Sequence, residues 1–327
     1  MAEPLRVIFM GTPMYAVPSL RALHGHADVA LALVVTQPDR PQGRGRKLQS
    51  PPVRLTADEL EVPVLQVSTL REASTRELLE STNPDLVVVA AFGIILGAKT
   101  LSLPKFGCIN LHASLLPKYR GANPIAAAIA MGEAKTGVTL MQMEQGLDTG
   151  PILSMNSLEI DLTDTTATLT PRLAELAGEL LRDSIADLAS GLSMPKEQPA
   201  GASLTRPMTK DDGWIDWTKS AADVANHVRA MVPWPRAWTT LPDGSRLQIH
   251  AVETRSVEAR AGAVTVSGDE MVVGCGSGSV HLTAIQFPGG NVLADRALID
   301  KTESIDGLVM GISGVPIARS PLVVDID

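Results

Sequence analysis

The sequence predicts an α/β fold, in which a Rossmann-like domain with a mostly parallel sheet precedes a small C-terminal β-barrel of the OB-like type. In the first half of the 327-residue chain, apolar β-branched runs alternate with helical patterns, which is typical of a parallel sheet covered by helices. These runs are continuously apolar, as in strands buried on both faces. In the last third, short strand-like runs separated by Gly, Asp and Ser replace this alternation, which is typical of a small β domain.

Strands of the first half are expected where apolar residues run without interruption, at 5–10, 29–36, 62–67, 85–91, 108–111 and 136–143. The helices expected between them cover 16–23, 54–60, 71–81 and 122–131. A longer amphipathic helix is expected over 166–190, because Leu169, Leu173, Leu176 and Leu180 recur every three or four residues.

The second half is expected to form a separate domain. Residues 191–207 are rich in proline and glycine and poor in apolar residues, which is typical of a linker. Beyond them, short strands are expected at 247–252, 263–266, 271–273 and 280–285, with one helix at 221–231. We therefore expect a first domain over 1–190, a linker over 191–207 and a C-terminal domain over 208–327.

The composition limits the possible function classes. With 28 basic and 36 acidic residues the chain has a formal net charge of −8, which argues against a general nucleic-acid binder but allows a local basic segment. Cys108 and Cys275 lie far apart, so no disulfide framework or Cys-x-x-Cys site is expected. The sequence shows neither a secretory signal pattern nor an apolar run approaching about 18 residues. We therefore expect a cytoplasmic protein.

Three polar residues are candidates for one shared site. Asn110 and His112 alternate with an apolar residue at the end of an expected strand, so their side chains point to the same face. Asp148 lies in the loop Gly-Leu-Asp-Thr-Gly after the next expected strand, where neighbouring strands would bring it to His112. Open α/β sheets bind ligands at the carboxyl ends of their strands. Taken singly, either motif is more typical of a hydrogen-bonded turn or a helix cap.

The sequence around these residues is similar to a known family. The similarity is carried by Val-Ile-Phe-Met-Gly-Thr-Pro at 7–13, Thr-Gln-Pro-Asp-Arg-Pro-Gln-Gly-Arg-Gly-Arg-Lys-Leu at 36–48, and the segments 109–121 and 136–150. Over nearly the whole chain it resembles the folate-dependent formyltransferases, and most closely those that act on methionyl-tRNA. The resemblance implies a formyltransferase catalytic domain over 1–190 and a C-terminal β-barrel over 208–327 that helps to hold tRNA.

The resemblance also implies the reaction and its candidate catalytic residues. The donor would be 10-formyltetrahydrofolate as a co-substrate, and the acceptor the α-amine of initiator methionyl-tRNA, giving N-formylmethionyl-tRNA for translation initiation. Asn110, His112 and Asp148 would be catalytic, and no metal is expected. The residue types suit this chemistry: Asn110 can donate to an oxyanion, His112 can act as an acid, and Asp148 can orient His112. The sequence leaves open which group accepts the amine proton.

Two further segments are expected to bind the folate. By family analogy, one is the loop of Ser114, Leu115, Leu116 and Pro117. Separately, no Gly-x-Ser-x-Gly elbow surrounds Ser114, so it is not expected to be a nucleophile. The other follows a buried strand and comprises Phe92, Gly93, Ile94, Ile95 and Leu96. It is expected to line the pterin pocket with its backbone and apolar side chains, although the same pattern also fits the core.

A basic insert is the candidate for binding tRNA. Residues 37–50 contain Arg40, Arg44, Arg46 and Lys47 with one acidic residue and no apolar periodicity. Charge alone favours a solvated connection, but an unstructured connection of about 14 residues is uncommon unless it is functional. We therefore expect a mobile loop that becomes ordered on tRNA.

The C-terminal domain gives a weaker signal for tRNA binding. Residues 208–327 contain 10 basic and 15 acidic residues, so a tRNA-binding surface would need the basic ones gathered on one face. The candidates for that face are Arg229, Arg236, Arg246, Arg255 and Arg260. Four tryptophans, at 214, 217, 234 and 238, are expected to pack in the core or between domains, or else to stack on unpaired bases.

Two other functions compete with this interpretation. The same catalytic domain could formylate an amino sugar or another small amine, but the basic insert and the C-terminal domain without a second catalytic motif favour tRNA. A non-catalytic folate- or RNA-binding protein would not need Asn110, His112 and Asp148 together. The expected protein is therefore a monomeric transferase with two substrates, the folate and the initiator tRNA.

Overall fold

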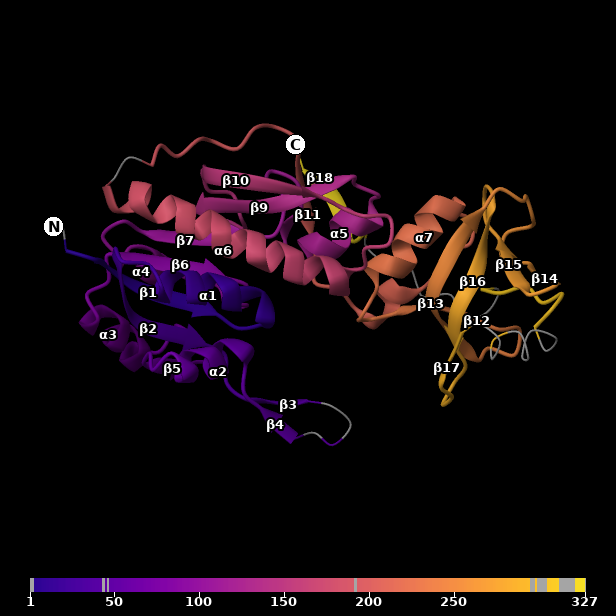
Figure 1. Cartoon of the computed structure of the whole chain (residues 1–327), viewed down its shortest axis with the longest axis horizontal. Coiled ribbons are helices and arrows are strands. Elements are labelled where there is room, and N and C mark those ends of the chain that lie inside the picture. Colours follow the sequence, from indigo (N-terminus) through magenta and orange to yellow (C-terminus); the bar gives the residue numbers. More distant parts are fainter. Residues whose placement is uncertain are drawn as a thin grey trace.

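The computed structural model describes residues 3–42, 45, 47–190, 193–294, 298, 305–311 and 321–326, and Figure 1 shows its two main parts. Seven strands in the described part of the chain form the sheet of the N-terminal part. In spatial order they are β10 (Ile152–Glu159), β9 (Lys135–Gln142), β7 (Cys108–His112), β6 (Leu86–Ala90), β1 (Leu5–Gly11), β2 (Val29–Thr36) and β5 (Val64–Gln66). The pairs from β7 to β5 are parallel, whereas β9 is antiparallel to β7 and β10 is antiparallel to β9. The predicted mostly parallel sheet is confirmed, with an antiparallel edge and a strand, β10, that the sequence did not indicate.

Helices cover both faces of this sheet, as the continuous apolar runs predict. They are η1 (Met14–Ala16), α1 (Val17–His24), α2 (Pro52–Glu59), α3 (Ala73–Ser81), α4 (Ala98–Leu101), α5 (Pro124–Ala130) and α6 (Thr166–Ser190). Along β1, Val7 and Phe9 belong to one buried cluster and Ile8 and Met10 to another, because successive side chains of a strand alternate between its faces. The long helix α6 has the predicted bounds, and Figure 1 shows it crossing one face of the sheet beside α1.

The C-terminal part is an antiparallel β domain with one packed helix. In its described residues the sheet contains β12 (Ala237–Thr240), β13 (Arg246–Arg255), β14 (Val264–Ser267), β15 (Glu270–Gly274), β16 (Ser279–Gln286) and β17 (Val292–Ala294). The helix α7 (Ala221–Ala230) contacts β13, and η2 (Lys210–Gly213) precedes it. Residues 308–311 connect the two outer strands of this order, β14 and β12. Leu308 O accepts from Val264 N of β14, and Gly311 N donates to Thr240 O of β12, both at 2.9 Å.

A further sheet joins three segments that lie far apart in the sequence. It contains β8 (Arg120–Gly121), β11 (Ala202–Thr205) and β18 (Val323–Ile326), with β11 in the middle. The expected linker at 191–207 therefore contains a strand. The end of the expected C-terminal domain, in turn, pairs with that strand and is not part of the six-stranded sheet, as Figure 1 shows. The division of the chain after 190 and before 208 stays a prediction.

The basic insert is not the unstructured loop that the sequence predicted. The strands β3 (Arg40–Gln42) and β4 (Lys47–Gln49) pair antiparallel as a hairpin, which projects from the sheet in Figure 1. The absence of apolar periodicity misled the prediction, because an exposed hairpin is held by backbone pairing and needs no buried face. Arg44 and Arg46 lie outside the described residues. Among the residues that are described, no helix is long and apolar enough to cross a membrane.

Candidate active site

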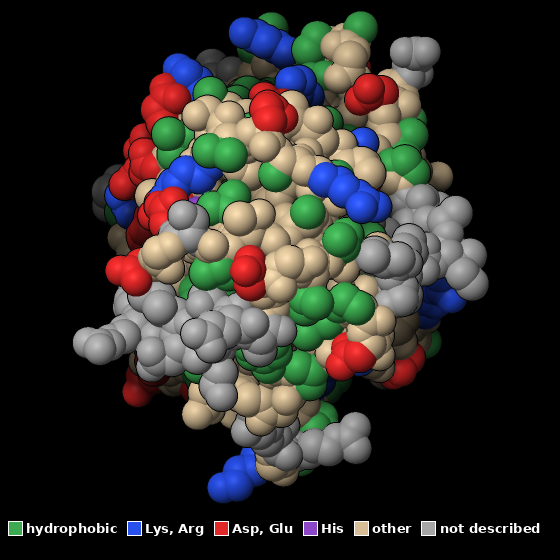
Figure 2. All heavy atoms as spheres, turned by 90° about the vertical axis from the view of Figure 1, so that its right-hand side faces the viewer, with side chains coloured by type: hydrophobic (Ala, Val, Ile, Leu, Met, Phe, Trp, Pro, Cys, Tyr) green, Lys and Arg blue, Asp and Glu red, His purple; other side chains and the backbone are tan. Residues whose placement is uncertain are grey.

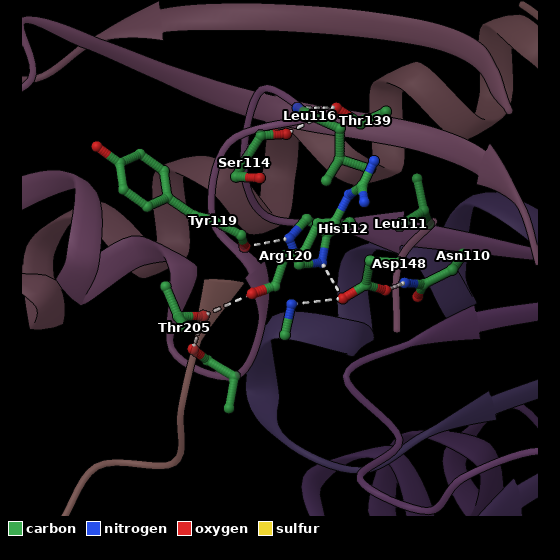
Figure 3. A network of polar contacts seen from close by, with 12 residues as sticks. Asn110, Leu111, His112, Ser114, Leu116, Tyr119, Arg120, Thr139, Asp148 and Thr205 are labelled. Atoms are coloured by element: carbon green, nitrogen blue, oxygen red, sulfur yellow. Dashed lines mark hydrogen bonds and ion pairs between the residues drawn. The ribbon is translucent and has the colours of Figure 1, made fainter. Parts of the chain in front are cut away.

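The strand β7 and the loop after β9 carry the three candidate catalytic residues. Asn110 and His112 lie at the end of β7, where they pair with Met141 and Thr139 of β9. Because β9 runs antiparallel to β7, its end leads away from His112, and the loop 143–151 brings Asp148 back to the site. Figure 3 shows the side chains of Asn110 and His112 converging on the Asp148 carboxylate. The predicted proximity of Asp148 and His112 is thus confirmed, because β7 and β9 are neighbours and the loop after β9 carries Asp148.

The Asp148 carboxylate is the centre of the cluster. Its Oδ1 accepts from Asn110 Nδ2 at 3.3 Å, and its Oδ2 accepts from the backbone N–H of Gly121 at 2.8 Å. The same Oδ2 lies 3.4 Å from His112 Nδ1. Only 6% of the His112 side chain and 13% of the Asp148 side chain are exposed, so water screens this ion pair weakly.

Both ring nitrogens of His112 face oxygen atoms. Nδ1 faces Asp148, and Nε2 lies 2.8 Å from the backbone carbonyl oxygen of Tyr119. A neutral imidazole has a single N–H donor, whereas the imidazolium donates at both nitrogens. The geometry therefore suits the charged ring, which can donate a proton or stabilise a developing negative charge.

Asp148 and Tyr119 hold these positions from unusual backbone conformations. Both residues lie in the left-handed region, with φ of 54° and 60°, which L-residues adopt at a cost that the surroundings must offset. The Tyr119 hydroxyl donates to Glu133 at 2.6 Å, and Figure 3 shows its ring pointing away from His112. Burial and the Glu133 carboxylate raise the pKa of Tyr119, so the phenol stays neutral and anchors the loop while its carbonyl oxygen contacts His112.

The expected folate loop at 114–117 is tied into the fold. The Ser114 hydroxyl donates to Lys118 O at 2.6 Å, and Thr139 Oγ1 donates to Ser114 O at 2.7 Å. Leu116 N donates to the same Thr139 oxygen at 3.1 Å, and the side chains of Ser114, Leu116 and Pro117 are buried while Leu115 is half-buried. The Ser114 hydroxyl therefore has a structural role as a donor to a backbone carbonyl, and contact of this loop with folate stays a prediction.

The expected pterin segment at 92–96 connects the ends of three strands. Phe92 O accepts from Thr12 Oγ1 at 2.9 Å and from Gln37 Nε2 at 2.8 Å, which ties the loop after β6 to those after β1 and β2. Phe92 and Leu96 are buried in the core, Ile94 packs against it, and Ile95 is 88% exposed. Gly93 has a φ of +76°, and a Cβ there would lie 2.5 Å from Gln37 Nε2. Gly93 and Ile95 are thus the exposed positions of this segment that a ligand can reach, while Ile94 is half-buried.

Cys108 of β7 is a buried cysteine without a disulfide. Burial raises the pKa of its thiol to about 12, so the nucleophilic thiolate is not populated near neutral pH. Among the residues that the structure describes, no group of three or more His, Cys, Asp and Glu side chains could hold a metal ion. A cavity of about 950 Å³ between α1 and α6 is lined by other described residues, and none of the three candidate catalytic residues lines it.

The basic residues lie in two different settings. Arg40 and Lys47 are exposed on the hairpin. In the C-terminal part, Arg229 donates to the carbonyl oxygens of Asp161 and Asp164, Arg236 contacts His250, Arg246 stacks on Trp238, and Arg255 pairs with Glu253 and Glu270. On the face that Figure 2 shows, the described Lys and Arg side chains are scattered among acidic and neutral ones. The single basic face that tRNA binding was expected to need is therefore not seen on that side.

The tryptophans mainly pack in the core, as the simpler interpretation predicted. Trp214, Trp217 and Trp238 are buried, and the first and last of these meet edge to face with their centroids 4.9 Å apart. Trp234 differs, since 52% of it is exposed. It is therefore the tryptophan whose ring remains free to stack on a base.

Sequence reasoning missed two backbone groups and one side chain that contact the cluster. The carbonyl of Tyr119 and the N–H of Gly121 contact His112 and Asp148, and such contacts do not depend on side-chain identity. Gln198 donates to the carbonyl of Asp148 from a segment whose proline and glycine content indicated a linker. The sequence holds no signal for this contact, because 50 residues separate the partners.

Comparison with known proteins defines the class of this chain. The profile of the formyl transferase family matches residues 5–185, and that of the formyl transferase C-terminal domain matches residues 207–319. The chain therefore belongs to the formyl transferase family, and it is an enzyme that transfers a formyl group. This confirms the family that the sequence motifs indicated.

Individual relatives narrow the comparison to one kind of enzyme. The methionyl-tRNA formyltransferase of Myxococcus xanthus is 45% identical over 295 residues, which cover 90% of this chain and 93% of that protein. The methionyl-tRNA formyltransferase of Stutzerimonas stutzeri is 41% identical over 315 residues, covering 95% of this chain and all of the relative. Both chains align over nearly their full length, so the relatives share both parts of this fold.

Solved structures of more distant proteins share the fold. The N-formyltransferase of Helicobacter canadensis, in complex with folinic acid and dTDP-3-aminofucose, has a TM-score of 0.62 and 16% identity. It covers 85% of this chain and 98% of its own. HypX of Aquifex aeolicus, in complex with tetrahydrofolic acid, has a TM-score of 0.58 and 16% identity and covers 98% of this chain and 50% of its own. At such identities the likeness concerns the fold alone.

Proposed function

We propose that this chain transfers the formyl group of 10-formyltetrahydrofolate to the α-amine of initiator methionyl-tRNA and so produces N-formylmethionyl-tRNA. The observation that carries the proposal is the convergence of Asn110 and His112 on the half-buried Asp148 carboxylate. The names of relatives at 41–45% identity over nearly the whole chain support the choice of substrate. A cytoplasmic monomer without a metal remains a prediction from the sequence.

The proposed reaction replaces one carbon–nitrogen bond by another. The neutral amine attacks the formyl carbon, the carbonyl oxygen becomes an oxyanion, and the bond to the folate nitrogen then breaks. The amine loses one proton and the folate nitrogen gains one. Catalysis therefore needs donors for the oxyanion and a proton for the leaving nitrogen.

The cluster offers both. One N–H of Asn110 Nδ2 donates to Asp148, which fixes the amide and leaves its second N–H for the oxyanion. A preorganised donor of this kind contributes roughly 2.7–4 kcal/mol to a transition state. The charged form of His112, held between Asp148 and Tyr119 O, adds positive charge beside the oxyanion. It is also the proposed acid for the folate nitrogen, to which Nε2 would donate its proton in place of Tyr119 O.

The proposed tRNA contacts are the four basic residues of the insert. Arg40 and Lys47 are exposed on paired strands, and with Arg44 and Arg46 they would place four cations beside the acceptor end. Arginine binds phosphate groups with two parallel hydrogen bonds, which also fixes their orientation. Segments 92–96 and 114–117 are the proposed folate contacts, through their backbone and the exposed side chain of Ile95.

Formylation assays with three acceptors test the proposal. Charged initiator tRNA should be formylated far faster than free methionine or a nucleotide-linked amino sugar, and the reverse order would favour the amino-sugar alternative. Asn110→Ala and His112→Ala should each lower kcat by about 10²-fold or more, as expected for groups that act on transition-state charge. The controls are Asn156→Ala and His24→Ala, which change exposed residues outside the cluster. Turnover of the site variants equal to that of the controls would remove Asn110 and His112 from catalysis.

A further inference from the structure

A single glutamine side chain joins the two loops that surround the candidate catalytic cluster. Gln198 Nε2 donates to the backbone carbonyl oxygens of Asp148 at 2.8 Å and Gly150 at 2.7 Å. Its Oε1 accepts from Nε and Nη2 of Arg120 at 3.0 Å and 2.7 Å. Both N–H groups and both lone pairs of the amide are therefore used. The amide orientation is fixed as well, because the carbonyls can only accept and the guanidinium can only donate.

These contacts close a ring around Asp148. Its carboxylate accepts from Gly121 N, and the neighbouring Arg120 donates to Gln198, which donates back to the carbonyl of Asp148. Side chain and backbone of Asp148 are thus held from the same strand, β8. A residue at φ 54° depends on such support, because its backbone would otherwise relax toward more favourable conformations.

The residues that follow Gln198 in the chain support the same loop. Ser203 Oγ accepts from Tyr119 N at 2.9 Å, and the carbonyl of Tyr119 contacts His112. Thr205 Oγ1 donates to Arg120 O at 2.9 Å, as Figure 3 shows. The segment 198–205 is therefore a brace along the catalytic loops. Within this brace, the Gln198 side chain hydrogen-bonds to the Asp148 loop through two backbone carbonyls.

We propose that Gln198 is a positioning residue, which keeps the Asp148 carboxylate in its contacts with His112 and Asn110. This inference rests on the proposed catalytic role of that cluster. Catalytic groups displaced by about 1 Å commonly lose about 10²-fold in rate. A residue that merely anchored the linker would change stability but not the chemical step.

Two substitutions of Gln198 separate positioning from anchoring. Gln198→Glu keeps the acceptor for Arg120 but removes both N–H donors and places a negative charge against the two carbonyl oxygens. Gln198→Leu removes all four contacts. We expect both variants to lower kcat by about 10–100-fold, with KM values for tRNA and folate within about threefold of the original. The matched control is Gln145→Glu, which adds the same charge at an exposed position of the Asp148 loop.

The measurements are single-turnover formylation rates, KM values and the melting temperature. A Gln198→Glu variant with the control's kcat would overturn the proposal, even if its melting temperature fell. If Gln198→Leu does not fold, Gln198→Glu and the shorter Gln198→Asn, which should also be slow, decide the question.

A double variant distinguishes failure of this inference from failure of the proposed function. If Gln198 acts through Asp148, Gln198→Glu should cost little further rate in an Asp148→Asn background. Additive losses would contradict the positioning role. A fully active Asp148→Asn variant would instead contradict the proposed catalytic cluster, whatever Gln198 does.

Discussion

Replacing Asp148 by asparagine is the sharpest single test of the candidate catalytic cluster. Asparagine has nearly the same shape and adopts left-handed backbone conformations as readily as aspartate, so the loop at φ 54° should keep its path. The change removes the negative charge and turns one acceptor oxygen into a donor. Its effect on rate therefore reports on the chemistry of the carboxylate and not on folding.

The structure allows the size of the effect to be worked out. In the unsubstituted protein, Asp148 Oδ1 accepts from Asn110 Nδ2 at 3.3 Å. In the variant, the oxygen of the new side-chain amide would stay toward Gly121 N and His112 Nδ1, so its NH₂ group would face the NH₂ group of Asn110. Asn110 must then rotate its amide and withdraw its donor from the oxyanion. Loss of a hydrogen bond to a charged group costs about 1.5–3 kcal/mol, and loss of an oxyanion donor about 2.7–4 kcal/mol. Together they correspond to a fall in kcat of roughly 10³–10⁵-fold.

Single-turnover formylation at saturating folate and tRNA measures this fall. The matched control is Asp28→Asn, because Asp28 also faces a histidine, His26, at 3.9 Å, but 62% of its side chain is exposed. We expect the control to retain its kcat. An Asp148→Asn rate within about threefold of the control would refute the reasoning, and Asp148 would then be a structural turn residue.

Three other predictions concern the ion pairs, the hairpin and a crowded glycine. Burial opposes ionisation of Asp212. Hydrogen bonds to its carboxylate, of which the one from Arg206 has the largest effect, outweigh burial and lower the pKa of Asp212 to about 2. The stability from this shift, about 2 kcal/mol, should be present above pH 4 and lost as the pH falls toward 2; urea unfolding of Asp212→Asn should lack this pH dependence. Replacing Arg40 and Lys47 by alanine should flatten the salt dependence of tRNA binding by roughly 0.7–0.9 per lost phosphate contact and leave the KM for folate unchanged; an unaltered slope would make the hairpin a bystander. Gly137→Ala should lower the free energy of unfolding by about 1–3 kcal/mol, because its Cβ would lie 2.1 Å from a backbone oxygen of β10. The melting temperature should therefore fall, and an unchanged melting temperature would count against this packing.

Local patterns predicted the parts of the fold that depend on burial. The apolar runs gave the strands of the parallel sheet, and the leucine spacing gave the bounds of α6, because both patterns report which side chains meet the core. The cluster of Asn110, His112 and Asp148 was also predicted, since strand ends collect functional groups in such sheets. The family resemblance strengthened this prediction and carried the choice of substrate.

Elements held by distant backbone pairing could not be predicted in this way. The strand β11 lies in a segment rich in proline and glycine, and its partners β8 and β18 are far away in the sequence. The hairpin of β3 and β4 buries no apolar face, so no periodicity marks it. Gln198 shows the same difficulty for the site, because a polar residue in a linker has no local feature that indicates its partner.

The β18 strand has a consequence for the order in which the molecule is completed. Leu204 pairs with Arg120 on one side and with Val324 on the other, so this sheet joins segments that the ribosome makes at widely different times. Synthesis adds roughly 5–20 residues per second, and contacts between remote segments form late. The parallel sheet and its helices can therefore collapse while the brace behind the site still lacks its outer strand. A nascent chain would then acquire its hydrophobic core first and its aligned catalytic loops last.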